Sequence, residues 1–153
     1  MKKLAMIALA LSMAFTPVST FAAGDDDDDA PSFGLAGILE RGNRETLPPL
    51  MLSAESPLAE GPMVLESGRY YRIDIIGDGS QELGLVGPGF FRAIWVNQIS
   101  VEGLEIRPLG LDSIEFDEAG TMRITFVAIK PGQYFLKIPG TTGETRRVEI
   151  TIE

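Results

Sequence analysis

Residues 120–134 read GTMRITFVAIKPGQY, and this stretch decides the fold class of the chain. In its first half, apolar side chains alternate with Arg123 and Thr125, at Met122, Ile124, Phe126 and Ala128. A period of two residues is typical of a β-strand with one buried face. After a Pro-Gly turn signal at 131–132, a second alternation follows, at Tyr134, Leu136 and Ile138. The stretch therefore predicts two successive strands joined by a tight turn, with the second alternating set in the core.

The same pattern continues along most of the chain. From Leu50 onward, turn signals containing glycine or proline separate short runs of β-branched and aromatic residues, for example at 70–75, 114–117 and 148–153. One helical turn is expected at the start of 87–95. Alternating runs with turns at this spacing predict an all-β fold, an antiparallel Greek-key sandwich or barrel with seven to eight strands after Leu50.

The N-terminus has the three parts of a secretory signal peptide. Lys2 and Lys3 form a basic start, residues 4–15 are an apolar run of 12, and small residues at Thr20 and Ala22 fit a cleavage site. Twelve apolar residues are too few to cross a bilayer core, which needs about 20. We therefore expect a signal peptide at 1–22, a periplasmic or secreted protein, and no membrane span.

The remaining chain is strongly acidic and contains no cysteine. Removal of Lys2 and Lys3 leaves 11 basic against 22 acidic residues, a net charge of about −11. Such a charge repels phosphate backbones, so no nucleic-acid partner is expected. Composition divides the chain into an acidic, flexible segment at 23–49 and a β-sandwich domain at 50–153.

The absence of histidine and cysteine excludes most familiar catalytic and metal sites. It removes Ser-His-Asp and Cys-His nucleophiles, imidazole or thiolate zinc sites, and the usual haem and iron–sulfur ligands. It also removes the ligand set of a blue-copper centre. Carboxylates at Glu115 and Asp117 would share the solvated face of a strand. We therefore expect that the chain is not an enzyme and carries no cofactor.

Two sets of residues could still bind a metal ion. The acidic run, made of Asp25, Asp26, Asp27, Asp28 and Asp29, is typical of a solvated spacer. It could instead hold a hard cation such as calcium or a lanthanide weakly, or dock a basic partner, although its spacing is not that of an EF-hand. The three methionines of the mature chain are either core residues or soft ligands for Cu(I): Met51, Met63 and Met122.

The dense aromatic cluster of Phe90, Phe91 and Trp95 has two interpretations. It could form a platform for a partner or ligand, or it could plug the core beneath a loop. The sequence leaves both open.

Residues 63–138 resemble the cupredoxin-like family of exported β-sandwich proteins. The resemblance lies in VLESGRYYRID at 64–74, in SQELGLVGPGFF at 80–91 and in the stretch at 120–134. It implies a cupredoxin-like sandwich. It also implies that the copper ligands of copper-binding members would fall at positions occupied here by non-ligands: Leu83, then Leu136 or Ile138, then Thr141.

These observations together predict an exported, cupredoxin-like binding or accessory protein without a type 1 copper centre. It would act through a periplasmic protein partner or a ligand. The alternative is a periplasmic metal-handling protein that uses the methionines for copper or the Asp25–Asp29 run for a hard cation.

Overall fold

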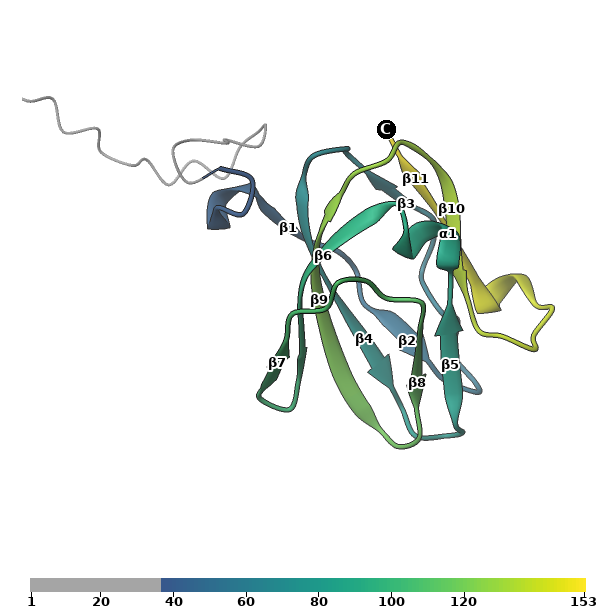
Figure 1. Cartoon of the computed structure of the whole chain (residues 1–153). Helices are drawn as coiled ribbons and strands as arrows, with labels where there is room; N and C mark the ends of the chain where they lie inside the picture. Colours follow the sequence, from purple (N-terminus) through teal and green to yellow (C-terminus); the bar gives the residue numbers. More distant parts are fainter. Residues whose placement is uncertain (1–36) are drawn as a thin grey trace, which may run out of the picture.

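The computed structural model describes residues 37–153, which form two β-sheets packed face to face (Figure 1). The first sheet contains β1 Arg44–Thr46, β2 Leu50–Leu52, β4 Tyr70–Gly77, β9 Gly120–Ala128, β6 Ile94–Val101 and β7 Leu104–Ile106. The second contains β3 Met63–Leu65, β11 Arg147–Ile152, β10 Gly132–Lys137, β5 Leu83–Val86 and β8 Ser113–Phe116. The helical elements in this part of the chain are short: η1 Arg41–Asn43, α1 Pro88–Phe91 and η2 Glu144–Arg146.

The alternation in β4 and β9 builds the centre of the first sheet. The two strands pair antiparallel over eight residues each, with Tyr71 opposite Phe126 and Ile73 opposite Ile124. Side chains of directly opposed residues lie on the same face of a sheet, so these pairs meet in the core. The rings of Tyr71 and Phe126 lie 5.7 Å apart. The all-β sandwich predicted from the alternating pattern is confirmed.

The strands are more numerous than expected, and not all of them are antiparallel. Ten strands lie from Leu50 onward, and β1 precedes that residue. The pairings of β1 and β2 with β4, and of β3 with β11, are parallel. These three strands have three residues each, which is too short for a two-residue period to be read from sequence.

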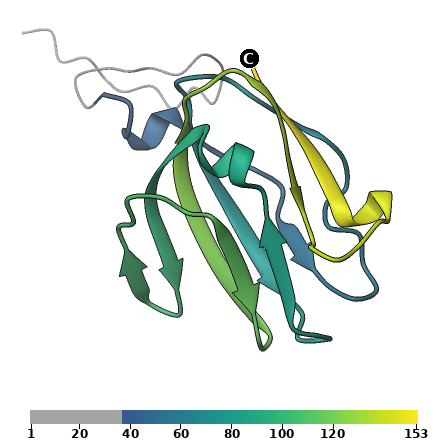
Figure 2. The ribbon, with the colours of Figure 1, turned by 45° about the vertical axis from the view of Figure 1, so that its right-hand side comes forward.

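The second sheet and α1 close the other side of the core. The expected helical turn is α1, which lies at one end of the sandwich beside β10 (Figure 2). The backbone passes close to β10 at Gly87, where a Cβ atom would lie 2.5 Å from the carbonyl oxygen of Phe135. Only glycine allows this approach without displacing the strand.

Within residues 37–153, no helix is both long enough and apolar enough to cross a membrane.

Candidate functional site

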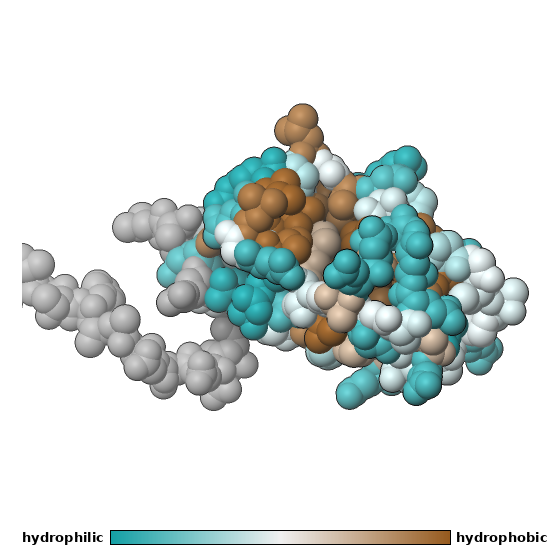
Figure 3. Space-filling view, turned by 90° about the horizontal axis from the view of Figure 1, so that it is seen from below, coloured by the Kyte–Doolittle hydropathy of each residue, from teal (hydrophilic) through white to brown (hydrophobic). Residues whose placement is uncertain are grey.

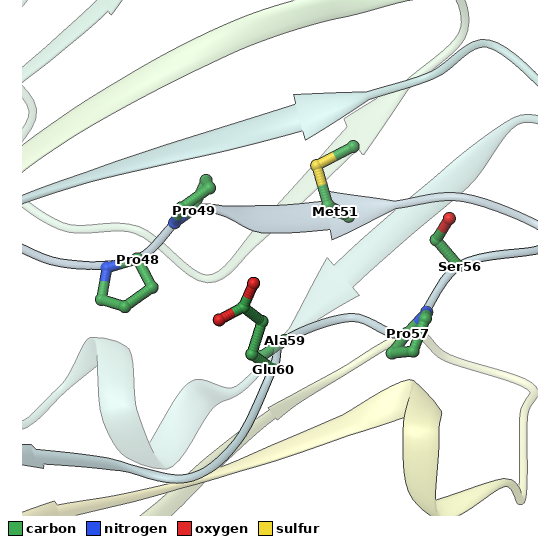
Figure 4. Close-up of a pocket in the computed structure, with 7 residues that line it drawn as sticks. All are labelled: Pro48, Pro49, Met51, Ser56, Pro57, Ala59 and Glu60. Carbon is green, nitrogen blue, oxygen red and sulfur yellow. The ribbon is translucent and has the colours of Figure 1, made fainter.

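A proline-lined pocket lies beside β2 and has a volume of about 300 Å³ (Figure 4). Pro48 and Pro49 lie at one end of it and Ser56 and Pro57 at the other. Its other lining residues, between these ends, are Met51, Ala59 and Glu60. Apart from the Glu60 carboxylate and the Ser56 hydroxyl, the side chains that line the pocket are apolar, which is typical of a site that takes an apolar group.

The sequence of β2 explains why Met51 faces the pocket. Leu50 and Leu52 are buried in the core, at 0% and 1% exposure, whereas Met51 between them is half-buried. Alternation along the strand thus places the thioether on the outer side. The side of the pocket opposite β2 is formed by residues 56–60 and is called the far wall here. The backbone N–H of Met51 donates to the carbonyl oxygen of Leu58 at 2.9 Å, which attaches the far wall to β2.

Arg146 fixes the loop that forms this far wall. Its guanidinium donates to the backbone carbonyl oxygens of Ser53, Ala54 and Ser56. The Ser53 hydroxyl oxygen in turn accepts the backbone N–H of Ser56 at 3.1 Å. A planar guanidinium that satisfies several carbonyls holds a loop in one conformation, so the pocket is formed in advance of any ligand.

Sequence reasoning missed this pocket. Its residues come from one segment, 48–60, and the only signal in the sequence is the density of proline there. Contacts with residues distant in sequence hold the segment around the cavity: Arg146 binds the carbonyl oxygens of 53–56, and the Leu58 N–H donates to the Thr145 carbonyl oxygen.

The positions that the cupredoxin-like resemblance implies for copper ligands carry side chains that are not ligands of a type 1 copper ion. Leu136 and Ile138 are buried at 2% exposure each, as expected for core residues. The Thr141 hydroxyl donates to the carbonyl oxygen of Ile138 at 2.7 Å, which closes the Pro-Gly turn on itself. A Cβ atom on Gly84, next to Leu83, would lie 3.3 Å from Pro139, so the two segments do meet in space. Because the chain contains no imidazole or thiolate, the donors at this end do not fit a type 1 copper ion.

The aromatic cluster is divided between the core and the surface. Phe90 and Phe91 are buried at 4% exposure each, and the Phe90 ring meets Phe126 edge-on at 5.7 Å. Trp95 is 48% exposed. Of the three residues proposed for partner binding, Trp95 alone offers an accessible ring.

The carboxylates of Glu115, in β8, and of Asp117, just after β8, lie on a solvated surface, as expected. Glu115 and Asp117 are both exposed. A hydrogen bond with the Glu115 carboxyl, together with the charges of Glu115 and Asp117, raises the pKa of Glu82 on the neighbouring segment. In the part of the chain that the structure describes, no group of three or more acidic side chains is arranged to hold a metal ion.

The methionines lie on three different strands. Met63 and Met122 are buried at 7% and 8% exposure in β3 and β9, while Met51 lines the proline pocket. No two of the three line the same pocket among those described. The Asp25–Asp29 run lies outside the described residues, so cation binding there stays a prediction.

Comparison with known proteins supports the fold and little beyond it. No protein-family model matches the chain, and no curated protein matches it in sequence. A solved multi-copper oxidase from Pseudomonas thermotolerans matches 74% of the chain with 18% identity and a TM-score of 0.53, over 31% of the oxidase. A blue copper oxidase and a copper nitrite reductase, both from Nitrosomonas europaea, match 65% and 62% of the chain with 14% and 15% identity and TM-scores of 0.47 and 0.48. The chain spans about a third of the length of each of these proteins, 31% and 33% for the latter two.

These neighbours correct one expectation. From the missing histidine and cysteine we expected that the chain is not an enzyme. The multi-copper oxidase that shares this fold is an enzyme, which contradicts that expectation. The physical reason is that a sandwich is stabilised by its inward-facing residues, whereas activity depends on the sites that the fold carries. What the comparison establishes for this chain is a cupredoxin-like β-sandwich.

Proposed function

We propose that this chain is an exported, cupredoxin-like binding protein that acts through protein or ligand contacts and has no type 1 copper centre. Export is supported by the signal-peptide pattern at 1–22. The absence of a type 1 centre is supported by the side chains at the positions implied for its ligands, Leu83, then Leu136 or Ile138, then Thr141.

The proline-lined pocket is the observation that carries the binding role. It is preformed, because Arg146 holds its far wall through three backbone carbonyls. Its lining is almost wholly apolar, with Glu60 as the one charged side chain among the residues that line it. A rigid apolar hollow of about 300 Å³ can take a small apolar molecule or the anchoring side chain of a partner protein.

Binding of a neutral apolar dye tests this role. Nile red fluoresces strongly in apolar surroundings, and we expect a saturable fluorescence increase when it is titrated with the full chain. Met51→Lys should abolish the increase, because it places a charge beside the apolar lining without altering Leu50 or Leu52.

Val64→Lys provides the matched control. Val64 is 62% exposed, lies on another three-residue strand, β3, and does not line the pocket. This variant should bind the dye as the unaltered chain does. The binding role of the pocket would be refuted by the absence of saturable binding, or by equal losses in the two variants.

A further inference from the structure

Two apolar rows on the inner face of the first sheet continue onto β7, where their side chains are exposed among the described residues. Directly opposed residues extend one row through Ile73, Ile124, Ile99 and Ile106, and the other through Ile75, Met122, Val101 and Leu104. Exposure rises from 5% at Ile99 to 42% at Ile106, and it reaches 61% at Leu104. The rows therefore leave the core at β7, with their apolar side chains still on the inner face.

β7 is also the edge of its sheet. Within residues 37–153 it pairs with β6 alone, and it lies at the margin of the sheet in Figure 1. The backbone groups on its other side can therefore pair with a further strand. Pro108 follows closely and has no N–H to donate, so the available ladder is short, centred on the three residues Leu104–Ile106.

A groove of about 370 Å³ lies between β8 and the start of β9 and extends to Val101 and Glu102, at the turn between β6 and β7. Its apolar lining includes Val101, Ile114, Phe116 and Met122. Its charged lining is exclusively acidic: Glu102, Glu115, Asp117 and Glu118. Figure 3, which views this end of the sandwich, shows a hydrophobic patch over the β6–β7 hairpin with hydrophilic residues around it. The surface thus fits a partner that is both apolar and basic.

The outer face of the sheet points to the same partner chemistry. There the row Asp74, Arg123, Ser100 and Glu105 ends in a carboxylate at β7. Arg107 lies 3.6 Å from Glu105, but both side chains are more than 60% exposed, and such pairs contribute little. A basic residue on an added strand would continue the row opposite Glu105.

We propose that β7 takes an extended segment of a partner protein as an additional strand. Apolar side chains of that segment would lie opposite Leu104 and Ile106, and Lys or Arg would lie between them, opposite Glu105. A second copy of this chain fits less well. Antiparallel pairing of two β7 strands centred on Glu105 would set Glu105 against Glu105, and both chains carry a net charge of −9.

This inference adds a partner surface to the proposed binding role and does not depend on the proline pocket. Met51→Lys tests the pocket and leaves β7 unchanged, so either proposal can be refuted without refuting the other.

The probe is the peptide acetyl-Val-Lys-Val-Lys-Val-amide, titrated into the full chain and followed by amide NMR. We expect saturable shifts of the amide signals of Leu104–Ile106. The peptide with Glu in place of each Lys should bind about tenfold more weakly, because a glutamate would then lie opposite Glu105. Glu105→Lys should reverse this preference between the two peptides.

Two leucine variants locate the site. Leu104→Lys should weaken binding of the lysine peptide about tenfold, since it removes apolar contact and adds a like charge. Leu109→Lys, at a fully exposed leucine of the β7–β8 loop outside the groove, should leave binding unchanged. The proposal would be overturned by shifts confined to other strands, by equal affinity for both peptides, or by no binding. Concentration-dependent self-association of the chain that Leu104→Lys abolishes would also overturn it, because β7 would then serve a second copy.

Discussion

At the scale of single residues, one ion pair joins the two central strands of the first sheet on its outer face. Asp74 of β4 and Arg123 of β9 lie directly opposite each other. The Nε of Arg123 donates to Oδ1 of Asp74 at 2.7 Å, and its Nη2 donates to Oδ2 at 2.9 Å. This bidentate hydrogen bond and the charge of Arg123 lower the pKa of the Asp74 carboxyl, against a smaller opposing effect of burial.

The pair makes the stability of the chain depend on pH. Because the pKa of Asp74 is lower in the folded chain than in the unfolded chain, the ionised carboxylate stabilises the fold at pH values above the unfolded pKa of about 4. This stabilisation is lost as the pH falls through the folded-state pKa. Asp74→Asn should therefore lower the free energy of unfolding by about 1 kcal/mol near neutral pH and by much less at about pH 2. Urea unfolding at both pH values measures the difference.

Asp112→Asn is the control for this experiment. Asp112 is exposed and forms no salt bridge among the described residues, so its loss should change stability little at either pH. An equal loss for Asp74→Asn at neutral and acidic pH would show that the carboxylate charge is not the cause.

At the scale of the elements, α1 is positioned by the close approach of Gly87 to β10. Its backbone is extended there, with φ −179°, so the requirement for glycine is steric. A Cβ would lie 2.5 Å from both Leu136 Cδ2 and the Phe135 carbonyl oxygen. The leucine side chain can move, but the carbonyl oxygen belongs to the β10 ladder.

Gly87→Ala should destabilise the chain by about 1–3 kcal/mol, the usual cost of overpacking. Gly89→Ala is the control within α1, where the added methyl would meet only Tyr134, at 3.7 Å. That change should be neutral or slightly stabilising, because alanine favours helix over glycine. Thermal unfolding of both variants distinguishes the two cases. Equal melting temperatures would refute the steric role of Gly87.

The long strands were predictable from sequence, and the irregular ones were not. β4 and β9 are eight and nine residues long, and the alternation through most of β4 and the first half of β9 was enough to assign both. In β6 the pattern is broken by a register shift between Val96 and Gln98. The extra residue there is Asn97, whose side-chain amide donates to the Tyr70 hydroxyl at 3.0 Å. After this bulge the inner face passes from even to odd residue numbers, which no fixed period predicts.

At the scale of the whole molecule, the candidate site was less predictable than the fold. The absence of histidine and cysteine at the positions implied for copper ligands, Leu83, then Leu136 or Ile138, then Thr141, could be read directly from the sequence. The proline pocket could not, because it requires Arg146 to reach a loop some 90 residues away in sequence. The exposed apolar side chains of β7 could not be predicted either, because their exposure depends on where the second sheet ends.

The central claim is that this cupredoxin-like sandwich has no type 1 copper centre. A blue copper centre requires a cysteine thiolate with histidine ligands, and the chain has neither residue type. The most direct measurement is the visible absorption spectrum of the purified full chain after addition of Cu(II), with a blue copper protein as positive control. We predict no intense blue absorption band, and the appearance of such a band would contradict the account.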